Sequence, residues 1–329
     1  MNGGGASVAE SILEVQQLTR RFGARTAVDS VDLYVNAGER YLLAGPAGAG
    51  KSTLVALLAT LLRPSSGIVN IDGFQLNREN HAIRGRIGVV FSDGMLDDRL
   101  TVRENLAARA ACYRLRKQEA SDAVAQAADR SGITARLGVR YGRLDPADRR
   151  RADFARALLT RPALLLLDDP ARCLDPSDAS AVLDLAARLA AETGAAVLQT
   201  ARTFDRLEGA DRIGILSAGR IRAEGTPSEL VERFASDRLR LAPRRDADSR
   251  AAIVRLLDAE GYRHSDIPSD DGTVLEVAIG NSMGALLLVN RVAGWISRFE
   301  MLRGDLGEAC VNALDSVGAD LGTKGGAVS

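Results

Sequence analysis

The segment GPAGAGKST at 45–53 constrains the fold of this chain more than any other feature. The apolar run YLLAG leads into it and the apolar run STLVALLATLL follows, a pattern that predicts a strand, a glycine-rich loop and a helix. In such a loop the glycines let backbone N–H groups face phosphate oxygens, Lys51 can reach the β- and γ-phosphates, and the Ser52 hydroxyl can bind Mg²⁺ at the positive end of the helix dipole. The predicted nucleotide-binding residues are Gly45, Pro46, Ala47, Gly48, Ala49, Gly50, Lys51, Ser52 and Thr53.

Two acidic residues at the end of a later apolar run support this prediction. The run ALLLLDD is continuously apolar until Asp168 and Asp169, as expected for a strand that is buried on both faces of a parallel sheet. A carboxylate at the end of such a strand suits a water-mediated Mg²⁺ ligand. We therefore predict that Ser52 and Asp168 hold the metal.

Strand-like and helix-like segments alternate along most of the chain, which predicts an α/β fold with parallel strands. Residues 101–131 have helical spacing, and Thr101 followed by Glu104 fits a capping box at their start. After about residue 235 the order of elements instead predicts a small α+β domain. The predicted organisation is a loose tail at 1–11, a nucleotide-binding domain at 12–235 with a helical subdomain at about 95–158, an α+β domain at 236–318 and a second tail at 319–329.

Composition excludes several classes of function. The 329 residues contain 43 Lys+Arg and 43 Asp+Glu, and a formal net charge of zero disfavours binding to nucleic acid. Three well-separated cysteines form no disulfide framework or paired-cysteine metal site. No apolar run reaches the roughly 18 residues that span a bilayer, and the first residues lack the pattern of a secretory signal. We expect a soluble protein that reaches a membrane only through a partner.

These motifs resemble those of the nucleotide-binding subunit of an ABC transporter, over nearly the whole chain. RRFG places Phe22 where the family has an adenine-stacking aromatic residue. RIGVVFSDGMLDDRLTVREN resembles the segment with the family's glutamine loop, and LDPADRRRADFARALL aligns without gaps to the region of its signature, LSGGQ. LLLLDDP resembles the second nucleotide motif, followed by LDP with Asp175 in place. The C-terminal segment most resembles the small domain of drug- and antibiotic-resistance ATPases of the ABC-2 exporter group.

The resemblance implies a P-loop NTPase of ABC type with a helical subdomain and a small C-terminal α+β domain. It implies ATP and Mg²⁺ as ligands. It also implies a head-to-tail dimer with a second nucleotide-binding subunit, of the same or another chain, in which each ATP lies between one phosphate loop and the other signature. The membrane permease would be a separate subunit, contacted around Ser92 and 95–115, which places the chain on the cytoplasmic face of the cell membrane.

The sequence departs from the family where hydrolysis occurs. Ser92 replaces the glutamine and is too short to reach both Mg²⁺ and the attacking water. Asp169 replaces the general-base glutamate and is one methylene shorter, although a base must come within about 3 Å of the proton it takes. The switch histidine falls at Ala201, with Arg202 beside it. The signature becomes Leu144, Asp145, Pro146, Ala147 and Asp148.

Two interpretations remain open from the sequence. In the first, the chain is an ABC transporter subunit, of an exporter, that binds ATP and hydrolyses it slowly. In the second, it is a catalytically inactive ATP-binding subunit with a structural or regulatory role in a heterodimeric complex. A soluble repair or translation factor is disfavoured, because such proteins usually have two nucleotide domains or a long coiled-coil insertion. A small-molecule kinase would not explain the match to the signature region.

Overall fold

The computed structural model describes residues 11–322, apart from 205–206, 208, 247, 270–271 and 280–281. The chain forms two compact units, unit 1 (Met1–Thr226) and unit 2 (Pro227–Ser329). Most of the two predicted tails, 1–10 and 323–329, lies outside the described residues. The tail prediction was wrong at Ser11, which pairs with Asn36 as the first residue of a strand, and at 319–322, which end a helix.

Unit 1 contains a six-stranded sheet in the order β10-β9-β3-β8-β7-β6. The strands are β3 (Arg40–Ala44), β6 (Ile87–Val90), β7 (Leu164–Asp168), β8 (Ala196–Ala201), β9 (Arg212–Ser217) and β10 (Arg220–Gly225). Strands β6, β7, β8, β3 and β9 pair in parallel, so their carboxyl ends meet at one edge, while β10 is antiparallel to β9. This arrangement confirms the predicted α/β fold.

A second, antiparallel sheet in unit 1 has the strand order β2-β1-β4-β5. Its strands are β1 (Ser11–Phe22), β2 (Arg25–Asn36), β4 (Ser66–Ile71) and β5 (Phe74–Gln75). The apolar side chains of this sheet share one core with α1 (Lys51–Leu58) and with Leu164 and Leu166 of β7. Helix α2 (Asn80–Arg86) contributes Ile83 to the same core.

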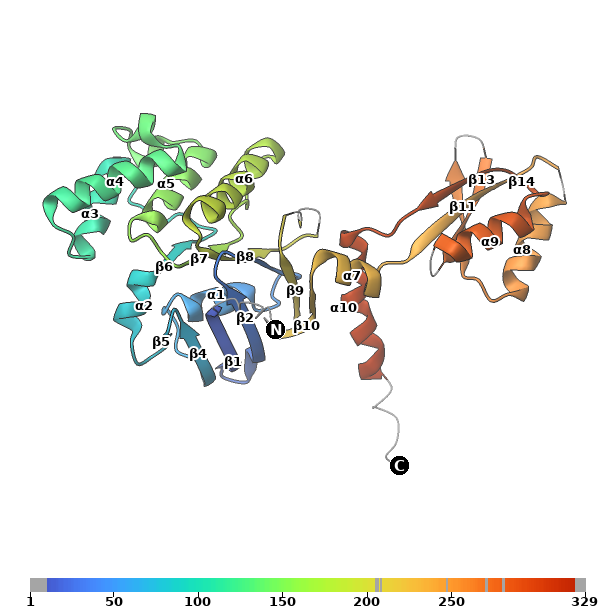
Figure 1. Ribbon diagram of the computed structural model, residues 1–329, viewed down its shortest axis with the longest axis horizontal. Helices are drawn as coiled ribbons and strands as arrows, with labels where there is room; N and C mark the ends of the chain where they lie inside the picture. The colour runs from blue at the N-terminus through green and yellow to red at the C-terminus, as the bar shows by residue number, and fades with distance from the viewer. Residues whose placement is uncertain are drawn as a thin grey trace, which may run out of the picture. The chain divides into compact units, whose positions relative to one another are not determined.

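Strand β7 is buried on both faces, as its sequence predicts. Leu164 and Leu166 face the core around α1, whereas Leu165 and Leu167 face a second core formed with the helical part of the unit. Figure 1 shows this separation, with α1 on one side of the six-stranded sheet and α5 and α6 on the other. The helices on that side are α3 (Val102–Cys112), α4 (Lys117–Ser131), α5 (Pro146–Leu158) and α6 (Pro176–Thr193).

The helical segment between β6 and β7 begins as predicted. Thr101 is the N-cap of α3, and its side chain and that of Glu104 bond reciprocally to each other's backbone N–H, which confirms the capping box. The single helical stretch expected at 101–131 is instead two helices, α3 and α4. The chain breaks between them at Arg114, whose φ of 58° does not fit a right-handed helix.

Unit 2 has the element order β-α-β-β-α-β, flanked by two further helices. A four-stranded antiparallel sheet has the order β12-β13-β11-β14, and α8 and α9 supply apolar side chains to its core. The elements are α7 (Pro227–Phe234), β11 (Asp237–Pro243), α8 (Ser249–Ala259), β12 (His264–Ser269), β13 (Gly272–Ile279), α9 (Ser282–Val292), β14 (Ile296–Leu302) and α10 (Leu306–Gly322).

The division between the units falls at 226/227, whereas the sequence places it at 235/236. Helix α7 belongs to unit 2 because it packs against α10, where the Asn312 side chain donates a 2.8 Å hydrogen bond to the Phe234 carbonyl. Sequence composition changes only after this helix, so it could not reveal the contact. In the part of the chain that the structure describes, no helix is long and apolar enough to cross a membrane.

Candidate functional site

The glycine-rich loop joins β3 to α1 and fits tightly against neighbouring backbone. A Cβ on Gly45 would lie 2.1 Å from the Leu216 carbonyl oxygen, and one on Gly50 would lie 2.2 Å from the Ala27 carbonyl oxygen. Gly50 also has a φ of 112°, which side chains rarely allow. By contrast, Gly48 has a φ of 79° but open space where a Cβ would be. Gly45 and Gly50 are therefore required because neighbouring backbone leaves no room for a side chain. Gly48 has room for one and lines the pocket.

Lys51 begins α1 and folds back over the loop. Its side chain is buried, and Nζ donates a 2.9 Å hydrogen bond to the Pro46 carbonyl and another to the Gly45 carbonyl. Burial, with a smaller contribution from Arg202, lowers the pKa of Lys51. The amino group is thus held at the inner edge of the loop, where phosphate oxygens would replace carbonyls as its partners.

Ser52 and Asp168 meet although 116 positions separate them. The Ser52 hydroxyl donates a 3.1 Å hydrogen bond to Asp168 Oδ1, which also accepts a 2.9 Å hydrogen bond from the Thr200 hydroxyl. The register explains the second contact, since Asp168 at the end of β7 pairs with Thr200 of β8. A hydroxyl and a carboxylate side by side provide the hard oxygen donors that Mg²⁺ prefers, so these residues fit the metal.

Asp169 follows directly but faces a cation. Its φ of 52° turns the chain sharply after β7, and Arg202 Nε lies 2.9 Å from Asp169 Oδ2 in an ion pair. Burial raises the pKa of Asp169, and the charge of Arg202 opposes that rise. Ala201, at the predicted switch position, ends β8 and has no polar side-chain atom. The sequence shows Arg202 beside this position, but only the fold brings it to Asp169.

A pocket of about 190 Å³, called the phosphate pocket below, is lined by Lys51, Ser52, Asp168, Asp169, Thr200 and Arg202 together with other residues of the loop. Four of its residues were not predicted: Arg25, Ala27, Thr200 and Arg202. Thr200 lies near the end of β8, which pairs with β7, and Arg202 directly follows β8. Their place at the end of this apolar strand is the signal in the sequence that could have indicated them. Phe22 is not among the lining residues. Its ring is 43% exposed and lies 4.4 Å from the guanidinium carbon of Arg20.

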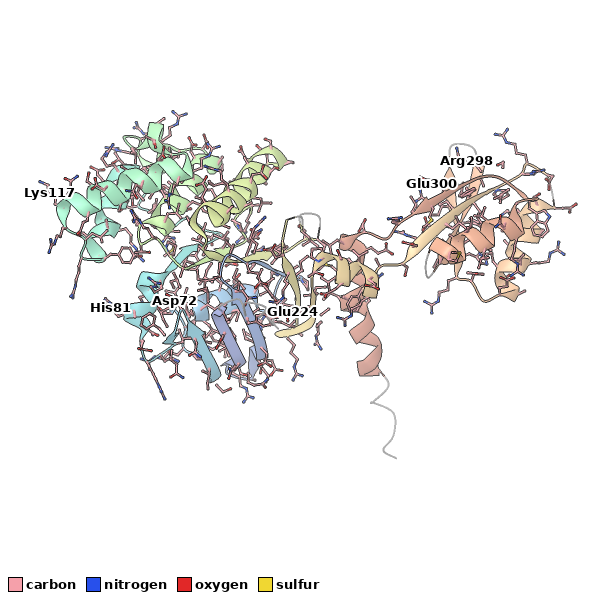
Figure 2. The ribbon with its side chains drawn as sticks, in the orientation of Figure 1. Asp72, His81, Lys117, Glu224, Arg298 and Glu300 are labelled. Atoms are coloured by element: carbon pink, nitrogen blue, oxygen red, sulfur yellow. The ribbon has the colours of Figure 1, made fainter. Side chains whose placement is uncertain are left out.

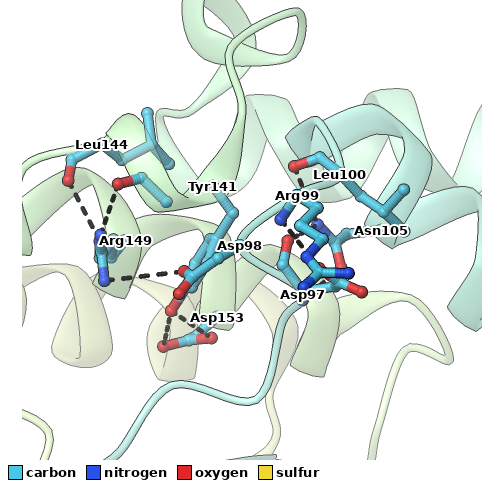
Figure 3. Close-up of polar contacts among 10 residues, drawn as sticks. Asp97, Asp98, Arg99, Leu100, Asn105, Tyr141, Leu144, Arg149 and Asp153 are labelled. Atoms are coloured by element: carbon cyan, nitrogen blue, oxygen red, sulfur yellow. Dashed lines mark hydrogen bonds and ion pairs between the residues drawn. The ribbon is translucent and has the colours of Figure 1, made fainter.

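Ser92 lies outside this pocket. Its carbonyl accepts a 2.9 Å hydrogen bond from Arg150, and its hydroxyl lies 3.4 Å from Arg172 Nη1. It lines a separate hollow of about 640 Å³, called the second hollow below. The second hollow is surrounded by residues from the loop after β6, the segment before α5 and the loop after β7. Figure 3 shows the polar contacts around three of its lining residues, Tyr141, Arg149 and Asp98.

The predicted signature residues form the start of α5. Asp145 is the N-cap, and its carboxylate accepts a 2.7 Å hydrogen bond from the Asp148 backbone N–H, while Pro146 occupies the first turn. Leu144, Ala147 and Asp148 are buried, and Asp148 forms ion pairs with Arg136 and Arg151. A carboxylate thus already caps the helix end that would otherwise offer N–H groups to an anion.

Asp175 repeats this arrangement at the start of α6. Its carboxylate accepts hydrogen bonds from the Asp178 backbone N–H at 2.9 Å and from the Ser177 hydroxyl at 2.8 Å. These bonds lower the pKa of Asp175. The two LDP triplets of the sequence are therefore the same structural element, an aspartate cap followed by a proline in the first helical turn.

A buried carboxylate, Asp153, lies beside the second hollow. The Tyr141 hydroxyl is 3.3 Å from both of its oxygens, as Figure 3 shows, and Arg150 Nη1 is 3.6 Å from one of them. Burial is the main cause that raises the pKa of Asp153 to about 6, against the opposing charge of Arg150. The folded protein therefore binds a proton here more tightly than the unfolded chain does.

This raised pKa predicts a pH-dependent stability. The contribution of the protonated Asp153 is fully present below the ordinary aspartate pKa of 3.8, and it is lost as the pH rises through the folded-state pKa of about 6. The free energy of unfolding of the wild type minus that of Asp153→Asn should fall by up to about 3 kcal/mol between about pH 4 and pH 7. Urea unfolding at several pH values measures it. Asp98→Asn, at an exposed carboxylate of the same hollow, is the control. A difference independent of pH would contradict the prediction.

Comparison with known proteins agrees with this geometry. The sequence model of the ABC transporter family matches residues 28–172. The daunorubicin resistance ATP-binding protein DrrA3 of Streptomyces coeruleorubidus is 35% identical, over 77% of this chain and 80% of its own length. The daunorubicin/doxorubicin resistance ATP-binding protein DrrA of Streptomyces peucetius is 36% identical, over 75% of each chain.

Solved structures are similar as well. An ATP-binding subunit of an ABC transporter, 27% identical, covers 67% of this chain and 91% of its own with a TM-score of 0.59. A dimeric ATP-binding cassette, solved in a post-hydrolysis state with ADP and Pi, is 26% identical and covers 65% of this chain and 98% of its own, also with a TM-score of 0.59. Fold, site geometry and relatives agree, and the chain belongs to the ABC transporter family as an ATP-binding subunit.

Proposed function

We propose that this chain binds Mg-ATP as the nucleotide-binding subunit of an ABC exporter and hydrolyses it slowly. The observation that carries the proposal is the contrast within one pocket. Lys51, Ser52 and Asp168 have the arrangement that a bound triphosphate needs, whereas Asp169 is held by Arg202. This contrast supports binding of the nucleotide together with slow cleavage.

Binding would use the loop and the ends of β7 and β8. The loop N–H groups and Lys51 would contact the phosphates, and Ser52 with Asp168, through water, would hold Mg²⁺. The metal, when bound, would neutralise phosphate charge. Phe22 would stack on the adenine after leaving Arg20, because its ring is already close to half exposed.

Slow hydrolysis follows from four changes. Asp169, as a weak general base, is shorter than glutamate and engaged by Arg202. Ala201 cannot donate a hydrogen bond, and Ser92 lies in the second hollow rather than in the phosphate pocket. The carboxylate of Asp145 caps the helix that would face the partner's ATP. Together these changes remove the groups that position and activate water.

The partners would be a second nucleotide-binding subunit, identical or different, and a membrane permease. In the dimer, Leu144–Asp148 and Asp175 would face the other subunit's ATP. The permease would dock around Ser92 and 95–115, where Met95 is 57% exposed beside the second hollow. The relatives named for drug resistance favour export, with this chain on the cytoplasmic face of the membrane.

The Arg202–Asp169 ion pair also favours a second candidate, a non-hydrolysing subunit that only binds ATP. Purified full-length chain separates the two candidates. Mg-ATP binding by calorimetry, with phosphate release that Asp169→Asn abolishes, supports the slow ATPase. Binding without phosphate release above that of Lys51→Ala supports the non-hydrolysing subunit, and absence of ATP binding contradicts both.

Restoring two side chains should raise hydrolysis. Asp169→Glu combined with Ala201→His extends the carboxylate by one methylene and supplies a hydrogen-bonding ring beside it. Restored general-base catalysis contributes about 100-fold or more in favourable cases, so we expect at least a tenfold gain in phosphate release. The assay needs a partner subunit with an intact signature. The control is the same pair of changes with Lys51→Ala. No gain would place the defect at Asp145–Asp148 or Ser92 instead.

A further inference from the structure

Arg202 lines the pocket, and its charge has no role in the binding arrangement described so far. The phosphate pocket is lined by three cationic side chains, Arg25, Lys51 and Arg202, and by two carboxylates, Asp168 and Asp169. Lys51 bonds to the loop, and Asp168 bonds to two hydroxyls. Arg202 instead reaches from the end of β8 to Asp169 at the end of β7.

Arg202 and Lys51 line the same pocket but come from different elements. Lys51 lies on the loop side of the pocket, against the carbonyls of Gly45 and Pro46. Arg202 lies on the side formed by the carboxyl ends of β7 and β8, and its side chain is 42% exposed. A phosphate chain bound at the loop would have to extend toward these strand ends to meet Arg202.

An uncompensated Asp169 would repel a phosphate chain. Two like charges a few ångströms apart in a partly buried site repel each other more strongly than in water, because the effective dielectric constant there is lower. The ion pair removes this repulsion. A guanidinium is planar and has five N–H donors, so it can hold a carboxylate through one edge and a phosphate through another.

We propose that Arg202 makes this subunit selective for nucleoside triphosphate over diphosphate, by neutralising Asp169 and binding the terminal phosphate directly. This inference rests on the proposed function, because it assumes that the pocket binds a nucleotide. In this proposal Arg202, which follows Ala201 at the switch position, helps the pocket to retain a bound triphosphate. The subunit would keep its triphosphate because the group that contacts the last phosphate also restrains the base.

The test compares equilibrium binding of Mg-ATP and Mg-ADP to the full-length chain by calorimetry. Arg202→Ala should weaken ATP binding about tenfold or more and change ADP binding by less than about threefold, since a charge-assisted hydrogen bond is lost only with the longer nucleotide. Arg202→Lys keeps the charge but lacks the planar set of donors, so it should restore only part of the ATP preference. A purely structural role would weaken both nucleotides together.

Arg172→Ala is the matched control. Arg172 also acts electrostatically on Asp169, but its guanidinium lies 3.8 Å from Asp93, and it lines the second hollow instead of the phosphate pocket. This variant should leave the ATP-to-ADP affinity ratio unchanged. A loss of the ratio equal to that of Arg202→Ala would overturn the proposal.

Repeating Arg202→Ala in an Asp169→Asn background separates the two roles of the arginine. We expect the ATP-to-ADP ratio to fall in this background too, because the terminal phosphate still loses a donor. If the ratio falls only when Asp169 is present, direct contact with phosphate is excluded and the proposal fails. Failure of the wild type to bind either nucleotide would overturn the proposed function. Wild-type binding with an unchanged ratio in Arg202→Ala would overturn this inference alone.

Discussion

Lys51→Ala is expected to weaken Mg-ATP binding about 10- to 100-fold. The buried amino group already forms two hydrogen bonds to loop carbonyls, so it is positioned where phosphate oxygens would become its partners. Hydrogen bonds to charged groups contribute about 1.5–3 kcal/mol, which corresponds to this range of affinity. Calorimetric titration of the full-length chain with Mg-ATP measures the change.

The matched control for this variant is Lys117→Ala. Lys117 is exposed at the start of α4, and Figure 2 shows it at the outer end of the helical part of unit 1. Because it contacts no group of the phosphate pocket, its removal should leave ATP affinity unchanged. Equal affinity of Lys51→Ala and wild type would mean that 45–53 is not the phosphate site.

Gly50→Ala is expected to destabilise unit 1 strongly. The new Cβ would lie 2.2 Å from the Ala27 carbonyl oxygen, and the residue would keep a φ of 112°. Left-handed backbone costs a residue with a side chain about 1–2 kcal/mol, and the displaced backbone adds about 1–3 kcal/mol. We therefore expect a loss of about 2–5 kcal/mol in the free energy of unfolding of unit 1.

Gly48→Ala provides the comparison within the same loop. Gly48 also has a positive φ, 79°, but nothing lies within 4 Å of an added Cβ, so only the backbone cost of about 1–2 kcal/mol applies. Urea unfolding followed by far-ultraviolet circular dichroism compares the variants. Fluorescence of Trp295, the single tryptophan, follows unit 2 separately. Equal losses in the free energy of unfolding for the two variants would show that the contact with Ala27 does not contribute to the effect of Gly50→Ala.

The phosphate loop and its surroundings could be predicted because their determinants are local. A strand, a turn that needs glycine and an apolar helix are specified by neighbouring residues, and β3, the loop and α1 confirm them. The Thr101 capping box is similarly local. The burial of β7 on both faces follows from its unbroken apolar run.

Other features depended on pairings that no local pattern contains. The register of β7 against β8 places Thr200 beside Asp168. The fold places Ser92 in a hollow of its own, although the resemblance to the family assigns it to hydrolysis. Burial raises the pKa of Asp153 to about 6, and nothing in the sequence around this residue indicates such burial. The assignment of α7 to unit 2 depends on its contact with α10 near the end of the chain.

The sequence by itself determined that this chain has a strand, a glycine-rich loop and a helix in that order, and a buried strand ending in Asp168. Short-range geometry specifies each of these features, so a single sequence is sufficient to find them. Only the tertiary structure decided what Asp169 faces. Arg202 lies 33 positions away and reaches it because β7 and β8 are adjacent parallel strands whose carboxyl ends share one edge.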